Sequence, residues 1–117
     1  MPIRTKVIAI GDDAYFEDYP LLVLFGSNCP DELKDVCILH EYIDQPTDDM
    51  LAEGTIILFG DKRYVVEQTG GVANENFMKL GHVSVNFSPD IELMPGSVLL
   101  SPYEVPKLQA GDTITIG

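Results

Sequence analysis

The sequence has 117 residues and a mass of 12.9 kDa, with 45% hydrophobic and 22% charged residues, so it fits one domain spanning residues 1–117. Seven Lys and Arg against 19 Asp and Glu give a formal net charge of −12, which repels nucleic acids and anionic lipid surfaces. The apolar runs are far shorter than a membrane span, and the first residues lack the apolar region of a signal peptide. We therefore expect a cytoplasmic protein with no nucleic-acid partner and no insertion into the membrane.

Short strands are favoured over long helices, because eight Pro and 10 Gly interrupt the chain. In chain order, alternating or apolar patterns predict strands at residues 3–10, 21–25, 36–42, 55–59, 64–67 and 83–87. Capping patterns predict one or two helical turns at residues 30–35 and a short helix at residues 72–80, which Gly81 ends. With about six to eight strands in all, we expect an all-β fold, a small closed or partly open β-barrel with one or two short helices.

A weak internal repeat supports this barrel. Each copy reads Leu, two residues, Gly and then a strand, and the copies begin at Leu51, Leu93 and Leu108. The glycine can take the positive φ that a tight turn needs, and the leucine can fill the core before the next strand. The spacings of 42 and 15 residues are unequal, which excludes a solenoid and indicates strands that enter one common core in similar ways.

Candidate chemistry concentrates on two histidines, because no phosphate-binding loop, dinucleotide fingerprint, serine nucleophile motif or zinc-protease motif is present. His40 ends an apolar row in the predicted strand 36–42, and Cys37 lies on the opposite face of that strand. His82 lies on the polar face of the strand that follows it. The two cysteines, Cys29 and Cys37, have no zinc-site spacing, so we expect reduced thiols.

Residue chemistry alone leaves several interpretations of these histidines open. Both can be structural, held by hydrogen bonds to the backbone. His40 and His82 could instead bind a metal ion together with Glu41 or Asp44, as in a metal-dependent hydrolase. A nucleophilic Cys37 paired with a histidine is a third interpretation, although Cys37 faces away from His40. Nothing in the sequence distinguishes a pair of catalytic carboxylates among the 19 acidic residues.

The segments around both histidines resemble a known family. Val-Cys-Ile-Leu-His at residues 36–40, followed by Asn-Phe-Met-Lys-Leu-Gly-His-Val-Ser-Val-Asn-Phe at residues 76–87, is similar to the glucitol/sorbitol-specific enzyme IIA components of the bacterial phosphoenolpyruvate-dependent sugar phosphotransferase system. The resemblance covers nearly the whole chain, including residues 31–33 and 95–96. In one respect the chain departs from the family, because Tyr42 stands where relatives carry a second histidine.

The resemblance implies a phosphotransferase component that works as a phosphohistidine carrier. His40 would be the phosphorylated nucleophile, accepting the group from an HPr-type phosphocarrier protein and passing it to the IIB component of the IIB/IIC sugar permease. The transfer would serve uptake and phosphorylation of a sugar alcohol such as sorbitol. Neutral imidazole suits this task, because it is nucleophilic near pH 7. No cofactor and no metal are implied.

Four other residues are candidates for assisting His40. His82 could stabilise the phosphoryl group, with the backbone N–H groups of Gly81 and His82 binding its oxygens. Glu41 or Asp44 could fix the tautomer of His40. The acidic surface could attract a carrier with a positive docking face, so that transfer would slow as salt rises. The main alternative is a noncatalytic regulatory or binding module with structural histidines.

Overall fold

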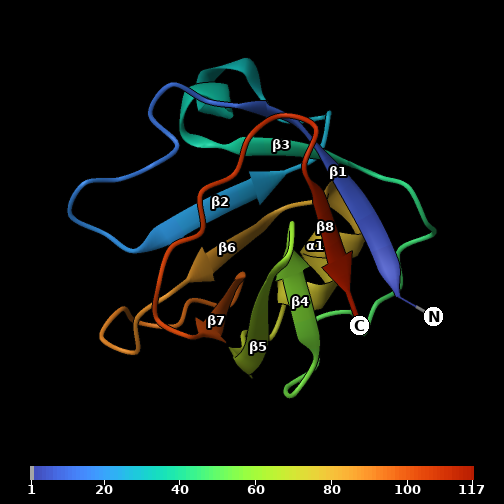
Figure 1. The fold of residues 1–117 in the computed structure, drawn as a ribbon, viewed down its shortest axis with the longest axis vertical. Helices are drawn as coiled ribbons and strands as arrows, with labels where there is room; N and C mark the ends of the chain where they lie inside the picture. The colour runs from blue at the N-terminus through green and yellow to red at the C-terminus, as the bar shows by residue number, and fades with distance from the viewer. Residues whose placement is uncertain (1) are drawn as a thin grey trace.

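The computed structural model describes residues 2–117, which form eight strands, one 3-10 helix and one α-helix (Figure 1). The strands are β1 (Ile3–Ile10), β2 (Leu21–Phe25), β3 (Ile38–Tyr42), β4 (Ile56–Phe59), β5 (Lys62–Thr69), β6 (Val83–Asn86), β7 (Ser97–Ser101) and β8 (Thr113–Ile116). The 3-10 helix η1 (Asp31–Val36) joins β2 to β3, and the helix α1 (Ala73–Leu80) joins β5 to β6. No helix within residues 2–117 is long and apolar enough to cross a membrane.

The strands form a closed barrel in the order β1-β3-β2-β6-β7-β5-β4-β8. The barrel closes where β1 pairs with β8, with Thr5 opposite Ile114. Two pairs, β2 with β3 and β6 with β7, are parallel, and the other pairs are antiparallel. This confirms the predicted small barrel of about six to eight strands and shows that it is closed rather than partly open.

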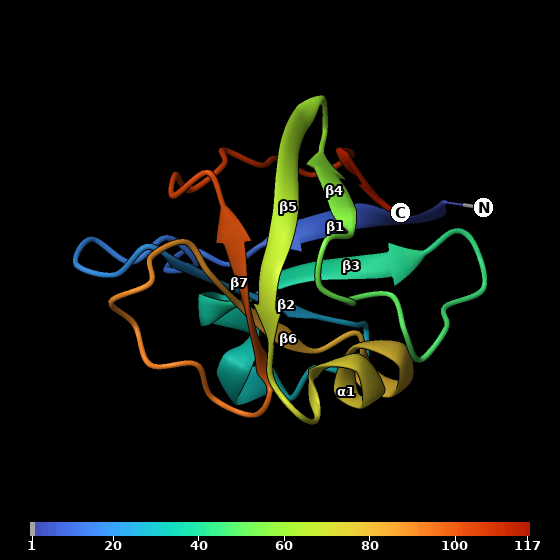
Figure 2. The same cartoon turned by 90° about the horizontal axis from the view of Figure 1, so that it is seen from below.

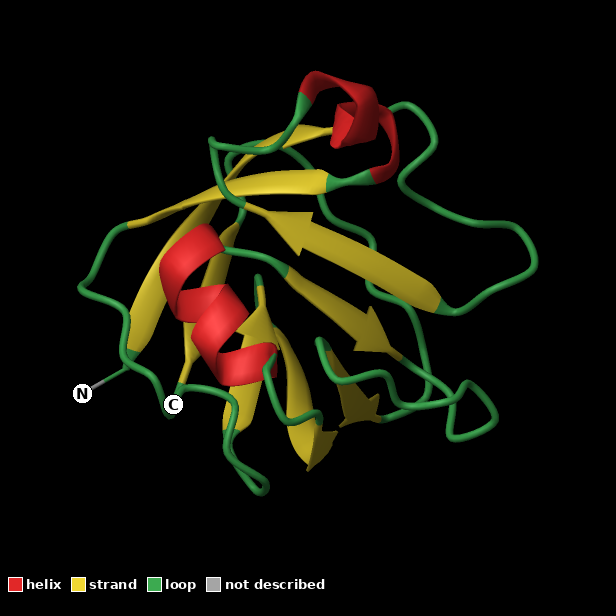
Figure 3. Ribbon diagram, turned by 180° about the vertical axis from the view of Figure 1, so that it is seen from behind, coloured by secondary structure: helices red, strands yellow, loops and turns green. Residues whose placement is uncertain are grey.

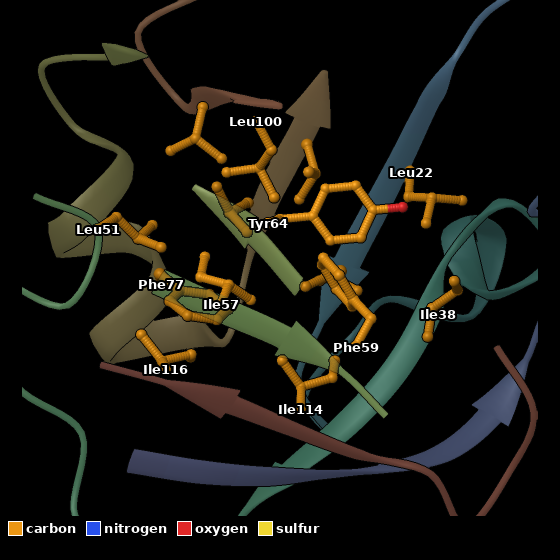
Figure 4. Packing of buried hydrophobic residues seen from close by; sticks show 14 of the residues in the cluster. Leu22, Ile38, Leu51, Ile57, Phe59, Tyr64, Phe77, Leu100, Ile114 and Ile116 are labelled. Atoms are coloured by element: carbon orange, nitrogen blue, oxygen red, sulfur yellow. The ribbon is translucent and has the colours of Figure 1, made fainter. Parts of the chain in front are cut away.

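The barrel interior is filled by side chains from every strand (Figure 4). Tyr64, Phe59 and Phe87 form edge-to-face aromatic contacts at its centre, with ring centroids 5.3 to 6.3 Å apart. The space that remains among the interior side chains is about 10 Å³, close to the volume needed for one water molecule. The interior is therefore a packed core rather than a ligand cavity, and any site lies outside it.

Helix α1 covers one end of the barrel (Figures 2 and 3). Its buried residues Ala73 and Phe77 belong to the main core, and Phe77 lies beside Ile57 in the interior (Figure 4). The helix ends at Gly81, whose φ of +67° is the left-handed conformation that glycine adopts without strain. The main chain just before this end is joined to the end of β2, because the Gly26 amide donates to the Leu80 carbonyl at 3.0 Å.

Most of the predicted elements are confirmed, and the differences have local causes. The strand predicted from residue 36 begins at Ile38, because Val36 completes the 3-10 helix. The strand predicted at residues 64–67 extends over Lys62–Thr69, because Lys62 and Arg63 continue the antiparallel pairing with β4 and only Gly60 and Asp61 form the turn.

The repeat of Leu, two residues and Gly holds in two of its three copies. Gly54 and Gly111 have φ values of +90° and +97°, and the leucines that precede them, Leu51 and Leu108, are buried. The copy that begins at Leu93 differs, since Leu93 is only half-buried and its glycine is not among those with positive φ. The copies that begin at Leu51 and Leu108 lead into the neighbouring strands β4 and β8. The copy that begins at Leu93 leads into β7, which pairs in parallel with β6.

Candidate functional site

His40 lies on the inward face of β3, in the wall of the barrel. The strand alternates, so Ile38 and His40 point inward while Glu41 is exposed. Its neighbour across the ladder is Val7 of β1. The His40 side chain is only 1% exposed, and its ring packs against Tyr42 and Phe77, with centroids 5.3 and 5.5 Å away. The sequence-based placement of His40 at the end of a buried row is confirmed.

Both ring nitrogens of His40 are hydrogen-bonded. Nε2 lies 2.7 Å from the carbonyl oxygen of Gly81, and Nδ1 lies 2.6 Å from Oγ1 of Thr5. A carbonyl oxygen can only accept, so the ring proton sits on Nε2 and the Thr5 hydroxyl donates to Nδ1. Burial lowers the pKa of His40 below its ordinary value of 6.5, while the hydrogen bond to Gly81 acts in the opposite direction. His40 is therefore a neutral imidazole near pH 7 with a defined tautomer.

A surface cavity of about 390 Å³ has His40 in its wall. Three segments that are distant in sequence form it: the turn after β2, the end of β3 and the last turn of α1. The lining residues are Gly26, Ser27, Asn28, His40, Glu41, Tyr42, Met78, Lys79, Leu80 and Gly81. Although almost no surface of His40 is open to solvent, the residue thus lines a concave surface with polar groups close by.

Gly81 supplies the cavity with a carbonyl group rather than with amide donors. The amides of Gly81 and His82 donate to the carbonyls of Phe77 and Asn76, at 3.0 and 3.3 Å, in the hydrogen-bond pattern that ends the helix. Both amides therefore have hydrogen-bond partners in this structure, and their binding of a phosphoryl oxygen stays a prediction. A side chain at residue 81 would also collide, because a Cβ atom would lie 2.8 Å from the Gly26 nitrogen and 3.1 Å from Nε2 of His40.

His82 follows Gly81 directly, but its ring faces a different cluster. The imidazole stacks on Phe25 with ring centroids 4.3 Å apart, and its Nδ1 lies 3.3 Å from the carbonyl oxygen of Leu24. Phe25 packs with Cys29 and Cys37 in a small cluster separate from the main core. The fold therefore brings the main chain of residues 81–82 to His40, while the His82 ring is not part of the cavity lining.

The alternative ligands and nucleophiles are not arranged as their chemistry requires. Asp44 pairs with Arg4, its Oδ2 lying 2.9 Å from the guanidinium Nε, and Glu41 is exposed. Neither carboxylate fixes the His40 tautomer, which Thr5 and Gly81 do instead. Within residues 2–117 no three His, Cys, Asp or Glu side chains are grouped closely enough to hold a metal ion.

The cysteine environment disfavours a thiolate. Cys37 is 1% exposed, and burial, followed by the neighbouring Cys29, raises its pKa to about 12. Both cysteines are free thiols in the structure, as the sequence predicted. A thiol with so high a pKa is almost entirely protonated at neutral pH and is a poor nucleophile.

Two functional candidates were missed by the sequence analysis. Thr5 contacts Nδ1 of His40, and the Tyr42 hydroxyl donates to the Phe77 carbonyl at 2.6 Å, which joins β3 to the last turn of α1. The signal for Thr5 was present, since it is a polar residue in the row that Ile3 and Val7 share on the inward face of β1. A polar side chain in a buried row needs a partner, but the sequence does not say which.

Comparison with known proteins assigns the family. The sequence model of the family described as PTS system glucitol/sorbitol-specific IIA component matches residues 2–115. The chain belongs to this family. The glucitol/sorbitol-specific EIIA components of Shigella flexneri and Escherichia coli (strain K12) are each 30% identical over 95 residues, covering 80% of this chain and 74% of theirs. A solved structure described as the PTS system IIA component from Enterococcus faecalis V583 superposes with a TM-score of 0.81 at 26% identity, covering 95% of this chain and 96% of that one.

In this member of the glucitol/sorbitol-specific IIA family, the segments that resemble the family lie next to each other in the fold. The two segments that carry the resemblance, residues 36–40 and 76–87, lie on β3 and on the α1–β6 connection. They meet at His40, whose Nε2 is hydrogen-bonded to the carbonyl oxygen of Gly81 and whose ring packs against Phe77. The segments that carry the resemblance therefore supply part of the cavity wall, together with the turn after β2 and the end of β3.

Proposed function

We propose that this IIA-family protein carries a phosphoryl group on His40. The group comes from an HPr-type phosphocarrier protein and goes to the IIB component of a IIB/IIC sugar permease, in support of uptake and phosphorylation of a sugar alcohol such as sorbitol. The observation that carries the proposal is the location of a neutral, oriented imidazole in the wall of a polar surface cavity, at the contact between two segments typical of the family.

The electronic state of His40 suits nucleophilic attack on phosphorus. Its lowered pKa keeps the ring neutral at physiological pH, and only a neutral imidazole has a nitrogen lone pair to offer. Phosphoryl transfer needs in-line positioning and stabilisation of the equatorial oxygens rather than elaborate covalent machinery. Hydrogen bonds at 2.6 and 2.7 Å orient the ring before transfer, and the bond to Gly81 has to open when phosphorus approaches.

Access to the ring requires a movement of the last turn of α1. The Gly81 carbonyl occupies the direction of the Nε2 proton, so this turn must shift for phosphorus to reach the nitrogen. The shift is local, because the turn lies at the end of an eight-residue helix and lines the cavity itself. Docking of a partner protein over the cavity would supply the binding energy for it.

Donors for the phosphoryl oxygens are available in the cavity lining. Ser27 and Asn28 lie on the turn after β2, and Lys79 lies in the last turn of α1, where it also pairs with Glu75 at 2.8 Å. Lys79 is one of only seven Lys and Arg residues in a chain of net charge −12. A cation beside the acceptor would offset the repulsion between the acidic protein and the phosphoryl group. His82 is a further candidate, if its ring turns away from Phe25 during transfer.

The test is transfer of label from a phosphorylated HPr-type carrier. The wild-type protein should acquire an acid-labile, base-stable phosphate that mass spectrometry locates on His40. The His40→Gln variant should acquire none, whereas Cys37→Ala should be labelled like the wild type and His82→Gln more slowly. Circular dichroism of each variant establishes that it is folded. Unchanged labelling of His40→Gln would refute the assignment.

A second candidate is a noncatalytic regulatory module in which His40 is structural. The observation that favours it is the 1% exposure of His40 together with hydrogen bonds at both ring nitrogens. In that case His40→Gln would lower the free energy of unfolding, and no phosphohistidine would form in the wild type. The same labelling experiment therefore distinguishes the two functions.

A further inference from the structure

Thr5 has an unusual position for a hydroxyl residue. It is 0% exposed, and in the barrel wall it lies opposite Tyr42 on one side and Ile114 on the other. Its register partner Tyr42 is two residues along β3 from His40, so Thr5 and His40 are diagonal neighbours on the inward face. Their side chains meet at 2.6 Å between Oγ1 and Nδ1.

The two nitrogens of His40 therefore face different surroundings. Nδ1 points to Thr5, which is fully buried and does not line the cavity. Nε2 points to Gly81, which lines the cavity together with His40. An incoming phosphorus atom could reach Nδ1 only by separating β1 from β3, two strands that pair in the closed barrel. It could reach Nε2 by displacing the end of one short helix.

We propose that Thr5 is a positioning residue for phosphoryl transfer, which holds Nδ1 of His40 inside the barrel wall so that Nε2 is the nitrogen that receives the phosphoryl group. This inference rests on the proposed function and deepens it. It assigns a task to a residue outside the two segments that carry the family resemblance. It also explains why a threonine hydroxyl, and not one of the 19 acidic residues, contacts the ring.

The step is balanced when the ring changes tautomer before attack. When Nε2 leaves the Gly81 carbonyl, water entering at the opened helix end accepts the Nε2 proton and gives a proton to Nδ1, so the ring remains neutral with a lone pair on Nε2. That lone pair forms the Nε2–P bond as the P–N bond of the carrier's phosphohistidine breaks, and the electron pair of the broken bond returns to the carrier's nitrogen. His40 becomes a phosphorylated imidazolium with a proton on Nδ1. The carrier's phosphohistidine, protonated on its other ring nitrogen, leaves as a neutral imidazole. No further proton is gained or lost.

A hydroxyl group can hydrogen-bond to Nδ1 both before and after the tautomer change, because it can donate as well as accept. Before transfer the Thr5 hydroxyl donates to the lone pair on Nδ1, as the distances and the Gly81 carbonyl require. After the tautomer change Oγ1 accepts from Nδ1–H and stabilises the imidazolium. A carboxylate could not donate in the first state, and it would hold the ring protonated and non-nucleophilic.

The experiment compares Thr5→Val, which removes the hydroxyl with little change of shape, with Thr5→Ser, which keeps it. Thr69→Val is the matched control, since the Thr69 hydroxyl donates to the Leu51 carbonyl and Thr69 does not line the cavity. Label from the phosphorylated carrier is followed over time, and nitrogen and phosphorus NMR of protein with ¹⁵N-labelled histidine identifies the phosphorylated nitrogen and the pH at which the phosphohistidine titrates.

The wild type should carry phosphate on Nε2. Thr5→Val should accept it about tenfold more slowly or worse, and its phosphohistidine should lose the Nδ1 proton at lower pH, because the acceptor of that proton is gone. Thr5→Ser should stay within a few-fold of the wild type, and Thr69→Val should match the wild type.

Phosphate on Nδ1 of His40 would overturn this inference and leave the proposed function standing, whereas absence of label on His40 would overturn both. An unchanged rate and titration in folded Thr5→Val would refute the role of Thr5. If Thr5→Val does not fold, the inference is tested by the phosphorylated nitrogen in the wild type and by the transfer rate of Thr5→Ser. Label on Nδ1 would contradict it, and so would a Thr5→Ser rate as low as that expected for Thr5→Val.

Discussion

The hydroxyl of Tyr42 lies 2.6 Å from the carbonyl oxygen of Phe77, so the strand that carries His40 also holds the last turn of α1. The Tyr42 ring contacts the rings of both His40 and Phe77 in edge-to-face geometry. Burial raises the pKa of Tyr42 well above its ordinary value, so the hydroxyl remains a proton donor at any pH at which the protein is used.

Replacing Tyr42 with Phe should therefore weaken this link without removing the ring contacts. We expect the free energy of unfolding in urea to fall by about 1 kcal/mol, the usual net contribution of one hydrogen bond. The control is Tyr19→Phe, because Tyr19 is 62% exposed and its hydroxyl contributes little to stability. Equal stability of the two variants would show that the Tyr42 hydroxyl does not hold the helix end.

Gly81→Ala should be more damaging than an ordinary surface substitution. The φ of +67° is strained for alanine, and the new Cβ would press on the nitrogen of Gly26 at 2.8 Å. We expect a loss of about 2 kcal/mol or more in the free energy of unfolding, measured by urea denaturation. Gly71→Ala is the control, since Gly71 has open space around it and no positive φ. A loss no larger than that of Gly71→Ala would contradict the described helix end.

The stability of the protein should fall as pH decreases through the histidine range. His40 has a lowered pKa in the folded state, so below about pH 6.5 the unfolded chain binds a proton there that the folded chain does not. This one group can remove at most about 1.4 kcal/mol per pH unit in that window. Urea unfolding between pH 7.5 and 5.5 should show a steeper loss in the wild type than in His40→Gln, which retains His82 and all carboxylates. If the free energy of unfolding fell equally with pH in both proteins, burial would not lower the pKa of His40.

Phosphoryl transfer from the carrier should slow as salt is added. The net charge of −12 favours encounter with a carrier whose docking face is positive, and this attraction is screened at high ionic strength. We expect the second-order rate to fall roughly tenfold between low salt and about 0.5 M NaCl. The measurement is the initial rate of label transfer at several NaCl concentrations, with the circular dichroism spectrum monitored in parallel. A rate that is independent of salt would exclude electrostatic steering.

Lys79→Gln should lower the rate of phosphoryl transfer more than a Lys→Gln substitution outside the cavity. Lys79 lines the cavity with His40, and its ammonium group is available to the phosphoryl oxygens once it leaves Glu75. We expect a decrease of about threefold or more, the effect of removing one partly exposed charge from the site. Lys107→Gln changes the net charge equally at an exposed position next to Tyr15, outside the cavity lining. Equal effects of the two variants would assign the change to net charge alone.

Local patterns predicted the fold well because each pattern has a local cause. Strict alternation of Val83 and Val85 with polar residues predicted β6, and the left-handed preference of Gly81 placed the end of α1. The boundaries that differed depend on pairing. Lys62 and Arg63 belong to β5 because β4 supplies partners across the turn, and their own propensities do not indicate this.

The candidate site was predicted only in part. The inward direction of His40 follows from the period of two in a strand, and the importance of residues 81–82 follows from their resemblance to the family. The hydrogen-bond partners of the Gly81 and His82 amides could not be foreseen, because they are carbonyl groups of the helix end itself. The orientation of the His82 ring depends on Phe25, a contact across 57 positions in the chain that no sequence period encodes.

The order of residues along the chain determined the strands, the helix ends, the acidic character and the family, because each depends on neighbours in sequence or on composition. Only the closed barrel decided the state of His40. The strand order of the barrel sets β1 beside β3, and the end of α1 lies beside the other segments of the cavity wall. This arrangement brings Thr5 and Gly81, residues 35 and 41 positions away, to opposite nitrogens of one ring. Those hydrogen bonds depend on the register of paired strands and on the place where a helix ends in space, and both are properties of the assembled barrel.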